Sequence, residues 1–193
     1  MKRKTFTLIE ILGVVAIIAI LATLGFAGYS YANTKSKEAA TEGLLTRLNA
    51  AFDLAQQKTG FMPPATSFAV ITIDKEGKWI AVKIDDNVKE YKVNSSATGK
   101  DKLYSNFCQI FVKTLELDKM KRFLNENNEV IDAWGNPIRF RYPGILKTGG
   151  FDLISAGPDG GFGSEPKDTP PDEVEDYRDK DNGEWICDDI AKF

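Results

Sequence analysis

The chain has 193 residues, of which 42% are apolar and 27% are charged, a composition typical of a globular protein rather than of a disordered one. It contains no histidine, which excludes serine–histidine and cysteine–histidine catalysis and the common zinc sites, so we do not expect an enzyme. The net charge of −3 conceals an acidic end, because residues 151–193 carry 13 Asp and Glu against 4 Lys and Arg. An acidic end without a basic patch also argues against nucleic-acid binding.

The first long segment is apolar enough to cross a membrane. Lys2, Arg3 and Lys4 form a basic head, and no charged residue occurs between Glu10 and Lys35. About 20 helical residues cross a bilayer core of about 30 Å, so residues 6–30 can span it. The basic head should stay in the cytoplasm and the rest of the chain should lie outside. A cleaved secretory signal peptide and a plain signal anchor are the alternatives, although a glutamate at the head of the run is foreign to a signal peptide.

The helical pattern continues beyond the membrane. Apolar residues recur along one helical face, at Ala40, Leu44, Leu48, Ala51, Phe52 and Ala55. No proline interrupts residues 6–62, and Gly60 followed by Pro63 and Pro64 is a helix stop. We therefore expect one helix from Phe6 to about Thr59.

Strand-like segments follow this helix. Residues 68–73 and 79–84 are rich in β-branched and aromatic side chains, and the turn residues 74–78 between them predict a hairpin. Residues 88–93 form a weaker third strand, and residues 94–100 have the composition of an exposed loop.

Two helices are expected next. Asp101 is the predicted N-cap of a helix that ends near Leu117, and a short helix is expected over residues 119–125. The first of these helices carries an apolar stripe at four-residue spacing, which we interpret as core: Tyr104, Cys108, Phe111 and Leu115.

The last third combines turn chemistry with an acidic, glycine-rich loop. Residues 132–137 read Asp-Ala-Trp-Gly-Asn-Pro, which predicts a turn before the alternating strand Arg139–Tyr142. Gly157, Gly160, Gly161 and Gly163 permit a tight loop whose carbonyl oxygens can turn inward. We expect little hydrophobic support for this loop, so a bound Ca²⁺, which takes six to eight oxygen ligands, could hold it closed. A solvated acidic loop is the alternative, and residues 179–183 do not have EF-hand spacing.

The N-terminus resembles that of type IV pilins and type II secretion pseudopilins. The match lies in Lys2-Arg3-Lys4-Thr5-Phe6-Thr7-Leu8-Ile9-Glu10-Ile11. The resemblance implies that a prepilin peptidase removes the leader, residues 1–5, and that Phe6 becomes the N-methylated first residue. It also implies that Glu10 pairs with the α-amino group of Phe6 on a neighbouring subunit, and a carboxylate in an apolar membrane segment needs such a partner. Thr5 stands where the family has glycine, so either the peptidase accepts threonine or the chain stays uncut.

The C-terminal third resembles the major pseudopilin of type II secretion, the G subunit. Residues 132–140 are similar to its Asp-Pro-Trp-Gly-Asn-Pro turn and following strand, and residues 151–160 to its second strand and the start of its calcium loop. Residues 60–63 and 188–190 are similar to two further segments of that family. Residues 68–125 do not match it clearly, so the hairpin region 68–100 is interpreted as an insertion.

The resemblance implies an α+β, pilin-like fold. A long N-terminal helix, transmembrane over residues 6–30 and then amphipathic, would pack on a small antiparallel sheet of three or four strands. Residues 31–193 would form a periplasmic head, with residues 156–193 as the acidic loop and C-terminus. The protein would be anchored once in the bacterial inner membrane.

The implied function is structural. The chain would polymerise through its N-terminal helices into a periplasmic pseudopilus, with minor pseudopilins and an inner-membrane assembly platform as partners. A type IV pilus subunit, a DNA-uptake pseudopilus subunit and a membrane-anchored binding module are the alternatives.

The resemblance also implies Ca²⁺ ligands in the acidic loop. Asp159 is the best side-chain candidate, and the backbone carbonyl of Ala156 is a second ligand. Asp188 or Asp189 would supply the other carboxylate, and the competitors are Asp168, Asp172 and Asp181.

Two cysteines lie on the exported side of the predicted topology. Cys108 and Cys187 could form one disulfide in an oxidising periplasm, which would tie the C-terminal segment to the middle helix. The alternative is a pair of free thiols, with Cys108 in the core.

Overall fold

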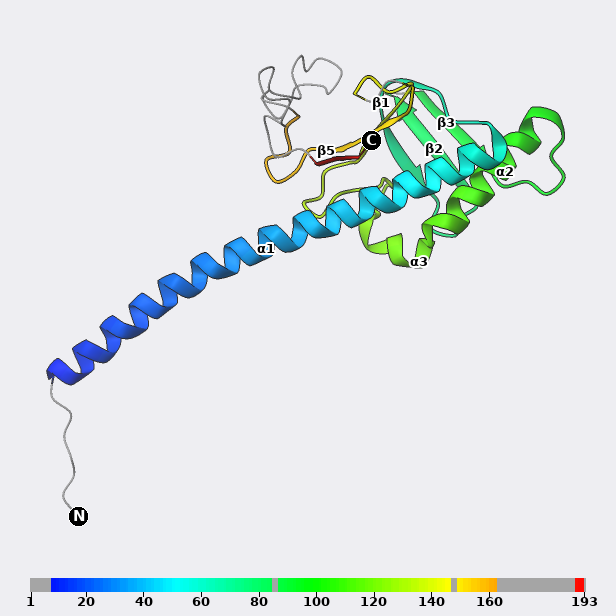
Figure 1. Ribbon diagram of the computed structural model, residues 1–193. Helices are drawn as coiled ribbons and strands as arrows, with labels where there is room; N and C mark the ends of the chain where they lie inside the picture. Colours follow the sequence, from blue (N-terminus) through cyan, green and yellow to red (C-terminus); the bar gives the residue numbers. More distant parts are fainter. Residues whose placement is uncertain (1–7, 85–86, 147–148, 163–189, 193) are drawn as a thin grey trace. The chain divides into compact units, whose positions relative to one another are not determined.

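The computed structural model describes residues 8–84, 87–146, 149–162 and 190–192 (Figure 1). The chain divides into two compact units, Met1–Lys37 and Glu38–Phe193, which we call the N-terminal unit and the head. The helix α1 (Leu8–Thr59) begins in the first unit and ends in the second, as the uninterrupted helical pattern predicts. It ends at Gly60, which adopts a φ of 69° and donates its N–H to the carbonyl of Gln56.

The head contains one antiparallel sheet of six strands in the order β3-β2-β1-β4-β5-β6. The strands are β1 (Ala65–Ile73), β2 (Trp79–Ile84), β3 (Asn87–Lys92), β4 (Arg139–Tyr142), β5 (Asp152–Ser155) and β6 (Ile190–Lys192). The predicted hairpin is confirmed as β1 and β2, with β3 as its third strand.

The expected count of three or four strands is wrong, because the hairpin and the C-terminal strands share one sheet. Strand β1 pairs with β2 on one side and with β4 on the other, where Ala69 lies opposite Phe140. The region interpreted as an insertion therefore supplies a central strand. The sixth strand, β6, is only three residues long and shows no alternation that a sequence pattern could reveal.

The hairpin turn needs a glycine for two reasons. Gly77 has a φ of 74°, which side chains rarely adopt. A Cβ at this position would also lie 2.7 Å from Cγ1 of Val112, so the turn approaches the helix of residues 99–115 closely. Asp74 completes the turn by accepting the N–H of Lys78 at 2.9 Å.

The middle helix, α2, runs from Gly99 to Leu115. Its N-cap is Thr98, so the prediction of Asp101 as the cap is wrong by three positions. Asp101 lies instead in the first turn, where its charge is favourable beside the positive end of the helix dipole. Helix α3 (Leu117–Met120) and the 3₁₀ turn η1 (Lys121–Phe123) occupy the place of the expected short helix.

The head has one main hydrophobic core. Figure 1 shows the last turns of α1 and helix α2 side by side on one face of the sheet. Phe52 of α1 is fully buried there, with its ring centroid 4.6 Å from those of Phe111 in α2 and Phe140 in β4. The predicted stripe of α2 is confirmed as core, since Cys108, Phe111 and Leu115 are fully buried.

Candidate functional site

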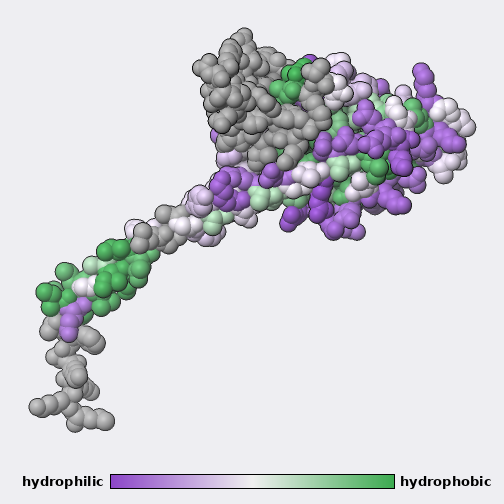
Figure 2. Space-filling view, viewed as in Figure 1, coloured by the Kyte–Doolittle hydropathy of each residue, from purple (hydrophilic) through white to green (hydrophobic). Residues whose placement is uncertain are grey.

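The N-terminal unit is an apolar helix whose side chains are exposed. Between Leu8 and Leu21 the large apolar residues are 56–83% exposed, and this section appears green in Figure 2. In the part of the chain that the structure describes, α1 is the helix long and apolar enough to cross a membrane. Glu10 lies in its first turn, where the helix dipole favours a carboxylate. Thr5 and Phe6 lie outside the described residues.

In the head, the carboxylate of Asp132 is the centre of a buried hydrogen-bond network, which we call the Asp132 hub. Asp132 is 3% exposed. Its Oδ1 accepts the backbone N–H groups of Trp134 and Asn136, both at 2.8 Å. Its Oδ2 accepts the hydroxyl of Ser155 at 2.7 Å and the side-chain amide of Asn136 at 3.3 Å. The predicted turn is thus closed by its own first residue, as expected for an Asx-type turn.

The hub holds the end of strand β5 and the residues that follow it. Asn136 Nδ2 donates to the carbonyl of Gly157 at 2.8 Å, and Gly157 N–H donates to the hydroxyl of Ser155 at 3.2 Å. Gly157 has a φ of 68°, so the chain turns sharply at this point. Because Ser155 and Asn136 are both bound to Asp132, the direction in which the acidic loop leaves the sheet depends on this one carboxylate.

The same turn is fastened to α1. The backbone N–H of Ala133 donates to Oγ1 of Thr41 at 3.1 Å, and Thr41 is fully buried. These two residues are 92 positions apart in the sequence. The hub therefore connects the head section of α1 to the start of the acidic loop.

The described beginning of the loop has an apolar base, which corrects the expectation of little hydrophobic support. Phe162 is 6% exposed and packs in a second cluster with Phe68, Ile154 and Ala156. The buried carboxylate of Asp152 accepts the N–H groups of Ile145 and Leu146 and so orders the β4–β5 connection. This base gives residues 156–162 apolar support.

Two of the predicted Ca²⁺ ligands lie among the described residues, three positions apart in the sequence. Ala156 is buried directly after β5, and Asp159 is exposed three residues later. Asp159 Oδ1 accepts the N–H of Gly161 at 2.9 Å. The other candidates, Asp168, Asp172, Asp181, Asp188 and Asp189, lie outside the described residues. Within the described ranges, no three His, Cys, Asp or Glu residues are grouped as a metal site.

Among the described residues, Cys108 is a cysteine without a disulfide partner, and it is fully buried in the main core. Burial raises the pKa of Cys108 to about 11, because the thiolate would lose its hydration. Cys187 lies outside the described residues, so the disulfide stays a prediction.

The sequence interpretation missed the role of Asp132, Asn136 and Ser155 as one network. It recognised the first two only as turn residues. A serine between the buried residues Ile154 and Ala156 was the available signal, because a buried hydroxyl needs a hydrogen-bond partner.

Comparisons with known proteins agree with this geometry. Residues 112–170 match the family model of type II secretion system (T2SS) protein G. The matched range contains the Asp132 hub, strands β4 and β5 and Asp159, whereas α1 and the hairpin lie outside it. No curated protein and no solved structure matches the chain. The matched family consists of structural subunits rather than enzymes, and the predicted resemblance to the G subunit, the major pseudopilin of type II secretion, is confirmed.

Proposed function

We propose that this chain is a structural pseudopilin subunit that polymerises through its N-terminal helix into a periplasmic pseudopilus of a type II secretion system. It is anchored in the bacterial inner membrane by the N-terminal section of α1, with the head in the periplasm. Its partners are further copies of itself, minor pseudopilins, the inner-membrane assembly platform and a prepilin peptidase.

One observation carries this proposal. Helix α1 has two sections with opposite surroundings: residues 8–23 are exposed and apolar, whereas Leu44, Leu48 and Phe52 form part of the core of the head. Exposed apolar surface of this extent needs lipid or other helices around it. When a subunit moves from the membrane into a filament, both environments are used in turn. The same apolar side chains contact lipid before assembly and neighbouring helices afterwards. The match to T2SS protein G supports the secretion assignment.

Replacing Glu10 by Ala tests the assembly step. The variant should insert into the membrane as well as the wild type, because it removes a charge from an apolar segment. Filament yield should fall at least tenfold, which corresponds to a loss of about 1.4 kcal/mol per contact. The measurement is the amount of chain in sheared, pelleted filaments from cells that carry the secretion machinery, with intact mass recorded to establish leader removal and methylation.

The matched control is Ile11→Ala, which removes a side chain of similar size from the next position without removing a charge. It should assemble far better than Glu10→Ala. Wild-type filament yield in Glu10→Ala would refute pairing between Glu10 and the amine of Phe6.

We further propose that the acidic loop binds Ca²⁺ through oxygen ligands. Asp159 and the carbonyl of Ala156 supply two of them, and Asp188 or Asp189 supplies a second carboxylate, with Asp168, Asp172 and Asp181 as competitors. Carboxylates and carbonyls are the donors that a hard cation prefers. The excess of 13 acidic over 4 basic residues in residues 151–193 supports a cation, because uncompensated carboxylates repel one another.

Calcium should raise the melting temperature of the full-length chain. A ligand at one hundred times its Kd stabilises the folded state by about 2.7 kcal/mol, which is a rise of about 5 to 10 °C for a protein of this size. Millimolar Mg²⁺ should do less, because it gives up its water reluctantly. The readout is the melting temperature in detergent with Ca²⁺, Mg²⁺ or EGTA.

Asp159→Ala should remove most of that calcium shift, whereas Asp101→Ala, at an exposed carboxylate of α2, should keep it. Equal calcium shifts in the wild type and in Asp159→Ala would exclude Asp159 as a ligand and leave the fold assignment intact.

A further inference from the structure

A groove in the head runs between α1 and the segment formed by α3 and η1. Its volume is about 440 Å³, and it is lined by Ala39, Ala40, Gly43, Leu44, Arg47, Asp118, Lys119, Arg122 and Phe123. All of these residues belong to the head. The groove is separate from the Asp132 hub and from the start of the acidic loop, and neither the hub nor the proposed Ca²⁺ ligands use its side chains.

The floor of the groove is apolar and open. Ala39 and Gly43 lie one turn apart on α1 and are both exposed. A Cβ added to Gly43 would meet nothing within 4 Å. Leu44 and Phe123 are buried at the base. A segment of another chain can therefore approach the helix backbone closely here.

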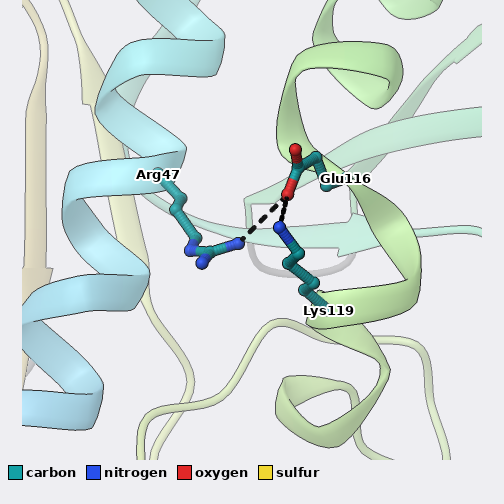
Figure 3. A network of polar contacts seen from close by, with 3 residues as sticks. All are labelled: Arg47, Glu116 and Lys119. Carbon is teal, nitrogen blue, oxygen red and sulfur yellow. Dashed lines mark ion pairs between the residues drawn. The ribbon is translucent and has the colours of Figure 1, made fainter.

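The rim of the groove is basic. Arg47 of α1 and Lys119 of α3 both contact the same carboxylate oxygen of Glu116, Arg47 at 3.7 Å (Figure 3). Glu116 has its pKa lowered, mainly by the hydrogen bond from Lys119. Arg122 lies over the ring of Phe123 at 4.6 Å, and Lys121 pairs with Asp118 at 2.8 Å.

The cations outnumber the anions at this rim. Three basic side chains, Arg47, Lys119 and Arg122, line the groove together with the single carboxylate of Asp118. The acidic residues of α1 nearest in sequence, Glu38 and Glu42, do not line the groove. The excess positive charge favours an acidic occupant.

We propose that this groove receives the acidic segment of residues 163–189 of a second copy of the chain. The proposal rests on the proposed function and adds to it a contact between heads. The occupant and the groove have complementary charge, since residues 163–189 carry 11 Asp and Glu against 3 Lys and Arg, whereas Arg47, Lys119 and Arg122 line the groove against Asp118.

The geometry of a filament favours this occupant over a symmetric pairing of two grooves. Two like-charged rims would repel each other if they met face to face. A contact between two different surfaces of the same chain repeats without closing and so builds an open polymer. A basic groove on one copy and an acidic segment on the next form such a pair.

Isotope-mixed cross-linking tests the contact directly. Full-length chains, one set unlabelled and one set labelled with ¹⁵N, are mixed in detergent, reconstituted into vesicles and treated with a zero-length carbodiimide. This reagent joins an amine to a carboxylate that it touches. We expect cross-links between Lys119 and residues 163–189 in which the two peptides carry different isotopes, which shows that they come from different copies.

Three outcomes would decide against the proposal. Cross-links from Lys119 to residues 163–189 in same-isotope pairs alone mean that the segment occupies the groove of its own chain. Mixed pairs in other regions with none at Lys119 mean that the chain polymerises without this contact, so the inference fails and the proposed function stands. An absence of mixed pairs anywhere contradicts the inference, because the contact is proposed to form between copies of this chain alone.

A variant pair sharpens the test. Gly43→Leu fills the groove and should lower the mixed Lys119 cross-link at least tenfold, while the melting temperature stays the same or rises because leucine favours helix over glycine. Ala50→Leu adds similar bulk at an exposed position of α1 outside the groove lining and should keep the cross-link. Equal cross-linking in the wild type and in Gly43→Leu would overturn the assignment of the groove as the docking site.

Discussion

Replacement of Asp132 by Asn should lower the free energy of unfolding by about 3 kcal/mol, although the two side chains have nearly the same shape. In the wild type, Oδ2 of Asp132 accepts the hydroxyl of Ser155 and the amide of Asn136. An Asn side chain presents only one acceptor oxygen, so an NH₂ group would face those two donors or the N–H groups of Trp134 and Asn136. Each buried donor left without a partner costs about 1–3 kcal/mol.

Urea denaturation followed by tryptophan fluorescence measures this loss. Ser155→Ala is the matched control, because it removes the two hydrogen bonds of this hydroxyl, one donated to Asp132 and one accepted from Gly157, and should cost about 1–2 kcal/mol. Asp132→Asn should also increase amide hydrogen exchange at Gly157 and Gly161, since the hub orients the start of the acidic loop. A loss below about 1 kcal/mol for Asp132→Asn would contradict the central role of this carboxylate.

The helices and strands were largely predictable because their signals are local. A 24-residue uncharged run and the apolar stripe up to Ala55 predict α1, and runs rich in β-branched and aromatic residues on either side of a turn predict β1 and β2. The start of α2 was misplaced because Asp101 and Thr98 are both plausible caps, and the choice depends on the chain that leads into the helix. The pairing of β1 with β4 could not be predicted, since these strands are distant in sequence and register is a tertiary property.

The Asp132 hub could not be predicted from the sequence for the same reason. The residue types of its turn were recognised, but the contacts of that turn are distant in sequence. Asp132 and Ser155 are 23 positions apart, and Ala133 and Thr41 are 92 positions apart. A sequence pattern contains no information on which buried polar groups meet. The resemblance to pseudopilins, by contrast, pointed to Glu10 and to residues 151–160, because those signatures are short and contiguous.

The hub and the core give α1 two attachments to the head. Thr41 binds the turn of residues 132–137, and Phe52 enters the aromatic core three turns later. When a subunit is pulled into a filament by its N-terminal helix, the contacts of Thr41 and Phe52 hold the head to that helix. The side chain with the larger buried area should contribute more to this attachment.

Phe52→Ala should therefore lower the free energy of unfolding by about 3–5 kcal/mol, the range for emptying a buried aromatic site. The ring is fully buried, and its centroid lies 4.6 Å from those of both Phe111 and Phe140, so the cavity would border α2 and the sheet together. Leu54→Ala, two residues further along α1 at a side chain that is 36% exposed, should cost much less. Urea denaturation measures both. Because loss of the ring loosens α1 from the head, Phe52→Ala should also make the α1–head junction near Gly60 more sensitive to protease, and equal stability in the two variants would contradict this attachment.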